Sequence, residues 1–321
     1  AARCYGVVLR DELSLPDNAD IADVARQVPW AWTSLQRATT VAQVAQLVSK
    51  REGEARGLVV ASTHLFYHPK ATHVRLIYAA LLSRHLHRAA ASLAERLPEG
   101  AHVGVILCGD MNCGRRCAPI TLLKTGGVPR SHPHWELARG FDWKKDVDSF
   151  WSSMDGVCVA PDERSSAIEP PDLSRIPSQA TPAHSSDQPP DLDDELVIQD
   201  ADEAIVEHNR RHIEALSTPE TCAAPPFAMD LSVPLRLSNA CDDPNVKFSL
   251  VLYEGHATRP MMLDHILFSS HLTLVTSCAT PRSFRPILEA IVRQGRKMMP
   301  SEIIPSDHLP VVADLRWSPH S

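Results

Sequence analysis

The 321-residue sequence lacks several features that would assign it to a common class of protein. No apolar run approaches the roughly 20 residues that a helix needs to cross a bilayer, so we expect no membrane contact. The first residues have no basic start followed by a long apolar stretch, as a signal peptide would. No glycine-rich phosphate loop and no internal repeat is present. The apolar share of 44% and the charged share of 22% are ordinary for a soluble globular protein.

Cysteines are present, but they lack the arrangement of a structural zinc site. Cys113 and Cys117 are spaced as in a metal knuckle, yet no second Cys/His pair at zinc-site spacing accompanies them. We therefore expect free thiols in a reducing, intracellular compartment. Because the chain begins at Ala1 rather than at Met, we also expect an amino-terminal part to be missing, and targeting cannot be read from it.

Acidic charge is concentrated in one segment. Residues 155–230 hold 17 of the 39 acidic side chains and 4 of the 32 basic ones, a net charge of −13 against +6 for the rest. The range 160–196 is rich in Pro, Ser and acid, and it buries too little apolar surface to offset its ordering entropy. We predict that 1–154 and 235–321 form one catalytic-type α/β domain, and that 155–234 is a largely disordered insertion open to a basic partner.

A strand, a crossover helix and a second strand can be predicted in the first half of the chain. The short apolar run 58–63 is typical of a buried strand, and 73–97 predicts a long amphipathic helix that ends at Pro98-Glu99-Gly100. Residues 103–108 alternate as in a strand, which completes a βαβ unit. Near-helical spacing of apolar residues also predicts a helix within 33–50. Further strands are expected at 247–253, 263–269, 272–277 and 310–317, and an isolated helix at 201–216.

Polar residues stand where these strands begin or end. Side chains at strand ends converge on one edge of an α/β sheet and can form a site there. Carboxylate and amide oxygens suit a hard cation such as Mg²⁺, and a His with an Asp partner can act as a general base in attack on a phosphodiester. Taken alone, each of these polar motifs is also compatible with a local turn or with a solvent-exposed pair of side chains. The residues concerned are His64, Asp110, Asn112, Asp264, Asp307 and His308.

The order of these pieces resembles the exonuclease–endonuclease–phosphatase superfamily, over roughly 30–145 and 235–317. Within it, His68-Pro69-Lys70 and Arg75-Leu76-Ile77 resemble the deadenylase-type branch, and especially the 2′,5′-phosphodiesterases. The resemblance implies two packed mixed β-sheets flanked by helices. It also implies a Mg²⁺-dependent phosphodiesterase or 3′-exoribonuclease that hydrolyses poly(A) or 2′,5′-oligoadenylate, and a mitochondrial compartment.

The same resemblance implies a role for each matching residue. His64 would stabilise the scissile phosphate, and Asp110 would position or deprotonate the water. Asn112 would hold phosphate or metal, and Asp264 would orient catalytic groups. His308 would bind phosphate or exchange a proton. Three further implied roles are metal binding by Asp307 and phosphate contacts by Lys70 and Arg75.

Departures from the superfamily pattern leave a second hypothesis open. The Asn and the metal-binding Glu that an amino-terminal half would supply are not found in the chain. Ser249-Leu250 stands where Thr-Asn is expected, and His265 stands in the place of a Tyr. The chain is therefore either part of an active phosphodiesterase or an inactive relative that serves as a binding or assembly module in an RNA-containing complex. A third alternative is another chemistry of the superfamily, such as that of a DNA-repair nuclease or a phosphatase, although His68-Pro69-Lys70 and Arg75-Leu76-Ile77 argue against it.

Overall fold

The computed structural model describes part of the chain in detail. The described residues are 5–14, 27–148, 228–243, 246, 248–254, 257–277, 306 and 308–319. By its internal contacts the chain divides into two units, 142–198 and the remainder. Of the first unit the structure describes 142–148, which contain the short π-helix η2 (Lys144–Asp148). All that follows concerns the other unit.

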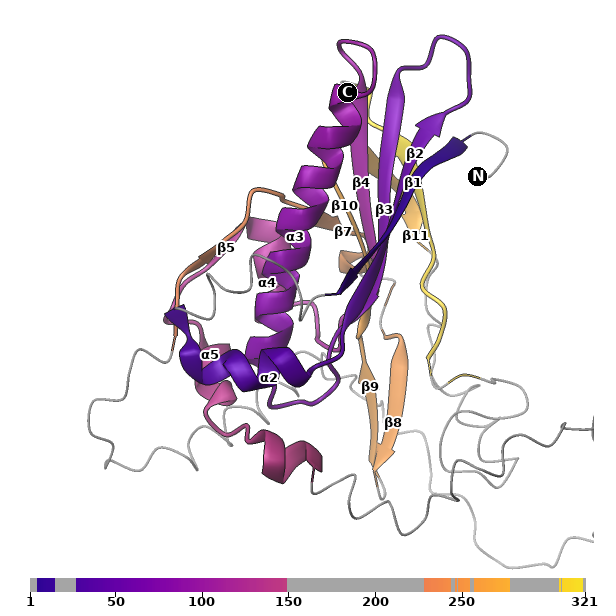
Figure 1. The fold of residues 1–321 in the computed structure, drawn as a ribbon. Coiled ribbons are helices and arrows are strands. Elements are labelled where there is room, and N and C mark those ends of the chain that lie inside the picture. The colour runs from indigo at the N-terminus through magenta and orange to yellow at the C-terminus, as the bar shows by residue number, and fades with distance from the viewer. Residues whose placement is uncertain are drawn as a thin grey trace, which may run out of the picture. The chain divides into compact units, whose positions relative to one another are not determined.

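A mixed six-stranded sheet forms the centre of this unit, in the order β1-β2-β3-β4-β10-β7 (Figure 1). β3 and β4 run parallel, and every other neighbouring pair in the sheet is antiparallel. The strands are β1 (Tyr5–Ser14), β2 (Val41–Ser49), β3 (Arg56–His64), β4 (His102–Asp110), β7 (Ser238–Asn239) and β10 (Asp264–Phe268). The predicted βαβ unit is therefore present, with α3 (Thr72–Glu95) as its crossover helix.

Helix α3 covers one face of the sheet. Alternate residues of β3, at 57, 59, 61 and 63, are buried on this face. The first three turns of α3 are buried almost all round, because α4 and α5 pack on its far side. The Tyr78 hydroxyl shares its one hydrogen between the carbonyl oxygens of Leu35 and Ala38, which fixes the end of α2 against α3. The helices beside α3 are α2 (Trp32–Arg37), α4 (Ala118–Thr125) and α5 (Pro133–Ala138).

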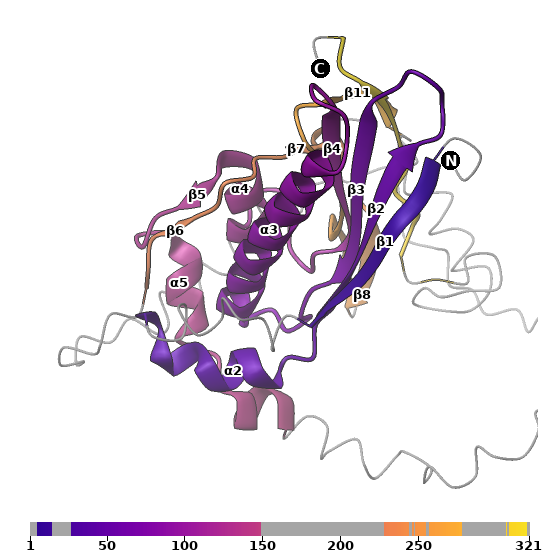
Figure 2. The same ribbon diagram turned by 45° about the horizontal axis from the view of Figure 1, so that its top comes forward.

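A two-stranded sheet packs on the opposite face. β11 (Leu272–Ser277) pairs with β12 (Ala313–Trp317), and Leu272 and Phe268 form an apolar cluster with side chains of both sheets. Figures 1 and 2 both place β11 on the side of the large sheet away from α3 and α4. The expected architecture of packed sheets flanked by helices is thus present, with one mixed sheet and one small antiparallel sheet.

The remaining elements are short. A β5–β6 pair and a β8–β9 pair are antiparallel. A single bridge joins Leu250 of β8 to His308. The bounds are β5 (Gly127–Val128), β6 (Leu231–Ser232), β8 (Leu250–Glu254), β9 (Ala257–Met261), η1 (Pro29–Ala31) and η5 (Ala240–Asp242). Among the described residues, no helix has the length and apolar character needed to span a membrane.

Two sequence predictions differ from the structure. The helix expected within 33–50 is limited to α2, and the rest of that range is β2. β2 buries Ala42, Val44 and Gln46, so its true period is two, but small and polar residues on both faces hide it. The other difference is a boundary, because β6 lies inside the range expected to be an insertion yet pairs with β5. The helix predicted at 201–216 lies outside the described residues.

Candidate active site

The strand ends that carry the predicted site lie side by side in the sheet. In register, His64 at the end of β3 stands beside Asp110 at the end of β4, and Asp110 stands beside Asp264 at the start of β10. Parallel β3 and β4 end at the same edge, where antiparallel β10 begins. The sheet therefore aligns three of the predicted side chains in one row.

Close approach of β3 and β4 at this edge depends on a glycine. Gly109 has φ +133°, and a Cβ placed there would lie 1.9 Å from the carbonyl oxygen of Thr63. Beyond the strand ends, the Leu65 N–H donates to the Asp110 carbonyl oxygen at 2.9 Å, and the Met111 N–H donates to the Leu263 carbonyl oxygen at 2.8 Å. These contacts fix the backbone on both sides of Asp110.

Asp110 is the most buried carboxylate of the row. Its side chain is 13% exposed, and its Oδ2 lies 3.3 Å from Nε2 of His64, which is 71% exposed. Burial raises the pKa of Asp110 above its ordinary value, the Asn112 N–H lowers it, and the neighbouring Asp264 raises it further. A raised pKa brings a carboxylate closer to the range in which it can exchange a proton with water near neutral pH.

His308 joins this group from the far end of the chain. Its Nδ1 lies 2.6 Å from Asp264 Oδ2, and its Nε2 lies 3.8 Å from Asp110 Oδ2. Both His308 and Asp264 are about three-quarters buried. The short contact at Nδ1 orients the imidazole, so that Nε2 is the ring nitrogen directed toward Asp110.

Asn112 turns the chain away from the edge. Its φ of +48° lies in the left-handed region, which Asn tolerates better than most residues. The Asn112 N–H donates to Asp110 Oδ1 at 2.7 Å, and Nδ2 donates to the Leu65 carbonyl oxygen at 2.7 Å. With Nδ2 engaged in this way, Oδ1 is the carboxamide atom that remains to accept a ligand.

The donor atoms at this edge fit a divalent cation. Asp110, Asp264 and His308 each offer one atom, and these atoms lie within 4.8 Å of one another. Carboxylates are preferred ligands of hard cations. Both carboxylates also contact a histidine, because Asp264 Oδ2 lies 2.6 Å from His308 Nδ1 and Asp110 Oδ2 lies 3.3 Å from His64 Nε2. Asp307, also predicted as a ligand, lies outside the described residues.

Comparison with known proteins yields matches in sequence and in fold. The human protein 2′,5′-phosphodiesterase 12 is 31% identical over 107 residues, which are 33% of this chain and 16% of that protein. The Bos taurus protein of the same name is 27% identical over 120 residues, 37% of this chain and 19% of that protein. The crystal structure of ANGEL2, a 2′,3′-cyclic phosphatase, in complex with adenosine-2′,3′-vanadate shares the fold. Its TM-score is 0.52 at 16% identity, over 98% of this chain and 68% of that one.

Over a third of its length the chain is thus similar in sequence to proteins named 2′,5′-phosphodiesterase 12, and it shares its fold with a 2′,3′-cyclic phosphatase. No family model matches. The matched segment spans less than a fifth of the length of these curated relatives.

The structure corrects the role predicted for Arg75. Its side chain is buried within α3, and its guanidinium donates to the carbonyl oxygens of Phe66, His68 and Pro69, at 3.0, 2.5 and 2.9 Å. Burial lowers the pKa of Arg75 below its ordinary value. Arg75 thus holds the loop that follows His64 and does not face a substrate phosphate. Lys70 ends the same loop and is half-buried.

Ser249 supports the site although its sequence context had suggested a loss. Its side chain is fully buried, and its Oγ accepts the N–H groups of Leu263 and Asp264 at 3.0 and 3.1 Å. Its carbonyl oxygen accepts the Leu309 N–H at 2.6 Å. Ser249 therefore fixes the backbone beside both Asp264 and His308. The hydroxyl shared by Ser and the expected Thr was the signal that could have identified it.

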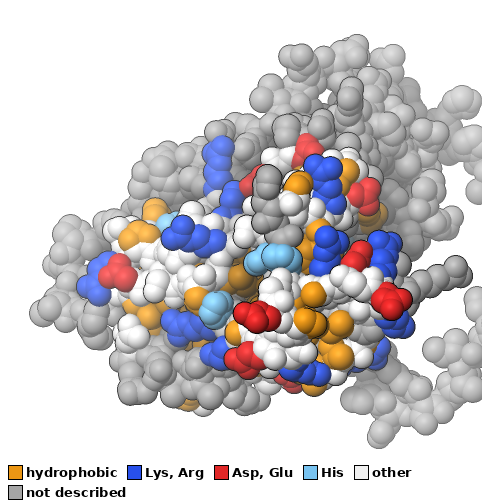
Figure 3. Space-filling view, turned by 90° about the horizontal axis from the view of Figure 1, so that it is seen from above, with side chains coloured by type: hydrophobic (Ala, Val, Ile, Leu, Met, Phe, Trp, Pro, Cys, Tyr) orange, Lys and Arg blue, Asp and Glu red, His pale blue; other side chains and the backbone are white. Residues whose placement is uncertain are grey.

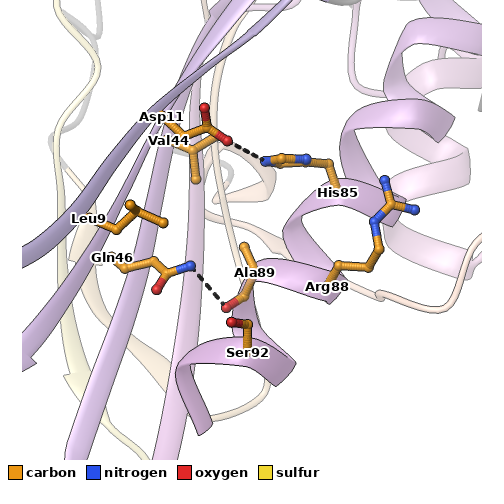
Figure 4. A pocket seen from close by; sticks show the side chains of 8 residues that line it. All are labelled: Leu9, Asp11, Val44, Gln46, His85, Arg88, Ala89 and Ser92. Carbon is orange, nitrogen blue, oxygen red and sulfur yellow. Dashed lines mark hydrogen bonds and ion pairs between the residues drawn. The ribbon is translucent and has the colours of Figure 1, made fainter. Parts of the chain in front are cut away.

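A second group of polar residues lies in a small groove between α3 and the outer strands. The α3 groove has a volume of about 210 Å³. In Figure 4, side chains of α3 face those of β1 and β2 across it. His85 Nε2 lies 3.7 Å from Asp11 Oδ2, and Gln46 Nε2 donates to the Ala89 carbonyl oxygen at 3.4 Å. Its lining residues are Leu9, Asp11, Val44, Gln46, His85, Arg88, Ala89 and Ser92.

Proposed function

We propose that this chain provides catalytic residues of a Mg²⁺-dependent phosphodiesterase that acts on adenylate-rich RNA, either poly(A) or 2′,5′-linked oligoadenylate. The observation that carries the proposal is the convergence of Asp110, Asp264 and His308 within 4.8 Å, with His64 at 3.3 Å from Asp110. The name 2′,5′-phosphodiesterase 12, which the curated relatives share, supports a phosphodiester as the substrate bond and a 2′,5′ linkage as one of the two candidates. The adenosine-2′,3′-vanadate bound to the structural neighbour supports an adenylate as the nucleotide of the substrate.

In the proposed reaction, Asp110 and Asn112 would hold the cation with their side-chain oxygens. Mg²⁺ bound there would stabilise the negative charge that develops on the phosphoryl oxygens. Asp307 lies next to His308 in the sequence and is proposed as a further ligand.

Proton transfer falls to the residues around Asp110. In the proposal, Asp110 also orients the attacking water and takes up its proton. Asp264 holds His308 through Nδ1, so that Nε2 of His308 binds the phosphate or exchanges a proton. His64 is mostly exposed to solvent beside Asp110, and in the proposal it contacts the scissile phosphate. Attack is in line, in one step, without a covalent enzyme intermediate.

The surface charge fits an extended polyanion only in part. Outside 155–230 the chain is net basic. At the end of the sheet where β3 and β4 begin, however, Figure 3 shows basic and acidic side chains interspersed among the described residues. Ion pairs such as Arg56–Glu54, at 3.9 Å, account for part of that mixture. We therefore place RNA at the opposite end, where β3 and β4 finish.

The direct test measures AMP released from poly(A) and from 2′,5′-linked oligoadenylate by the purified protein, with Mg²⁺ and after its removal by a chelator. We expect release only with the metal, and loss of release in an Asp110→Asn variant. Equal rates in Asp110→Asn and wild-type protein would refute the assignment. Binding of oligoadenylate without release at any Mg²⁺ concentration would identify a binding module instead.

A further inference from the structure

A buried histidine outside the predicted site bridges three segments beside it. His265 follows Asp264 in β10 and is 1% exposed. Its side chain points to the helix-covered face, and Gly109, its partner in register on β4, has no side chain there. Its ring nitrogens contact the loop after β4 on one side and β7 on the other.

The partners fix both the tautomer and the orientation of this ring. His265 Nε2 lies 2.9 Å from the Cys113 carbonyl oxygen, which can only accept, so Nε2 carries the proton. Nδ1 then accepts from Asn239 Nδ2 at 3.0 Å. Asn239 Oδ1 in turn accepts the Cys241 N–H at 3.0 Å, which sets the direction of the amide. Every polar atom of the two side chains named here has a partner of the right kind.

The atom that His265 holds lies one residue beyond Asn112. Asn112 is tied on the β3 side, because its Nδ2 donates to the Leu65 carbonyl oxygen. On the β10 side, the Met111 N–H donates to the Leu263 carbonyl oxygen. The His265–Cys113 hydrogen bond thus holds the backbone directly after Asn112, the residue with the left-handed φ.

We propose that His265 is a positioning residue, which holds Asn112 in its working orientation through the Cys113 carbonyl group. This inference rests on the proposed function, in which the Asn112 carboxamide binds phosphate or metal. Without the imidazole, the Cys113 carbonyl oxygen and Asn239 Nδ2 both lose the hydrogen-bond partner described above. The loop then relieves that cost by moving, and Asn112 moves with it.

A double-mutant cycle in the purified protein tests this coupling. His265→Leu should lower kcat/KM for oligoadenylate about tenfold in the wild-type background, as expected for a misplaced contact. In an Asn112→Ala background the same change should cost less than about twofold, since the group it positions is gone. Equal losses in both backgrounds would overturn the proposal.

Two further variants separate positioning from general stability. His265→Gln keeps an amide N–H near the place of Nε2, so it should restore most of kcat/KM. His73→Leu is the matched control, because His73 is also 1% exposed and neither of its ring nitrogens has a hydrogen-bond partner among the described residues. It should not change kcat/KM. Loss in His265→Gln equal to that in His265→Leu would reject the role of the hydrogen bond.

A measurement that does not depend on hydrolysis keeps the two proposals apart. The side-chain amide of Asn112 gives a pair of NMR signals, which can be assigned by their absence in Asn112→Ala. We expect His265→Leu to shift or broaden them, and His73→Leu to leave them unchanged. A protein without phosphodiesterase activity would refute the proposed function alone, whereas an unmoved Asn112 signal in His265→Leu would refute the positioning role.

Discussion

The site edge and the α3 groove both contain a histidine beside an aspartate, yet the two pairs are held very differently. At the site, His308 Nδ1 lies 2.6 Å from Asp264 Oδ2, and both side chains are about three-quarters buried. In the groove, His85 Nε2 lies 3.7 Å from Asp11 Oδ2, and the Asp11 side chain is 52% exposed (Figure 4). Solvent screens the second pair far more than the first.

The backbone around each aspartate accounts for the difference. Asp264 starts an interior strand, and its N–H is held by the buried Ser249 hydroxyl. Asp11 lies on β1, which is the edge strand of the sheet. A His–Asp pair therefore indicates a catalytic site only where a rigid backbone places further polar groups beside it, as Asp110 lies beside His308 and Asp264.

The largest difference between the two regions should appear in catalysis. Asp110→Ala removes a proposed metal ligand and base, so we expect kcat to fall about 1,000-fold, or roughly 4 kcal/mol in activation free energy. Asp11→Ala, in the groove, should change kcat less than about twofold, because a surface pair contributes little. Steady-state hydrolysis of 2′,5′-oligoadenylate measures both. Comparable losses in the two variants would place the chemistry in the groove as well.

The next effect concerns folding stability at the site edge. A Cβ on Gly109 would lie 1.9 Å from the Thr63 carbonyl oxygen, so β3 and β4 must separate in Gly109→Ala. We expect a loss of about 3 kcal/mol or more in the free energy of unfolding. Gly53→Ala is the control, since Gly53 has φ +78° with no atom within 4 Å of a built Cβ. It should cost only about 1 kcal/mol, and urea denaturation distinguishes the two.

A smaller effect is expected for the serine behind the site. Ser249→Ala leaves the N–H groups of Leu263 and Asp264 without their acceptor in a fully buried position, which costs about 1–3 kcal/mol in unfolding free energy. Ser92→Ala, in the exposed rim of the groove, should change stability by less than about 0.5 kcal/mol. Ser249→Thr keeps the hydroxyl and should be milder than Ser249→Ala. A destabilised Ser92→Ala would show that the groove is more rigid than its exposure indicates.

The smallest effect appears as a pH dependence of stability. Burial, with the nearby Arg75 charge, lowers the pKa of His73 to about 3 from the ordinary 6.5. As the pH falls, His73 therefore takes up its proton in the unfolded chain before it does so in the folded protein. The stability that neutral His73 contributes is fully present above pH 6.5 and is lost as the pH falls from 6.5 toward 3. The loss is about 1.4 kcal/mol per pH unit, hence roughly 1.4 kcal/mol at pH 5.5.

Urea denaturation between pH 7.5 and pH 5 checks this prediction. The His73→Phe variant should lose stability less steeply on acidification than the wild type, because it removes the titrating group and keeps an aromatic ring among Trp30 and Phe141. Parallel curves for the two proteins would show that His73 does not contribute.

Local patterns were enough to predict the centre of the fold. The strand–helix–strand run from 58 to 110 follows from one apolar run, one long amphipathic segment and one alternating segment, and β11 matches its predicted range. β2 was missed, because Gln46 is buried on the same face as Val44 and resembles a solvent-facing residue in the sequence. Its strand character comes from pairing with β1 and β3.

The candidate site was predictable where its residues end strands. His64, Asp110 and Asp264 converge because the sheet brings β3, β4 and β10 together, which the motif order anticipated. Their roles in the reaction remain predictions. The contacts of Ser249, His265 and Arg75 could not be read from the sequence, because each depends on a backbone group contributed by a different segment.

The pairing of β4 with β10 has a consequence for how the chain can vary. Asp110 and Asp264 are neighbours in the sheet, yet more than half of the long stretch of chain between them lies outside the described residues. The distance between the two carboxylates is therefore set by the antiparallel pairing of β4 and β10 and not by how far apart Asp110 and Asp264 lie in the sequence. Any change that shifts this pairing by one residue would turn one of the two side chains to the other face of the sheet.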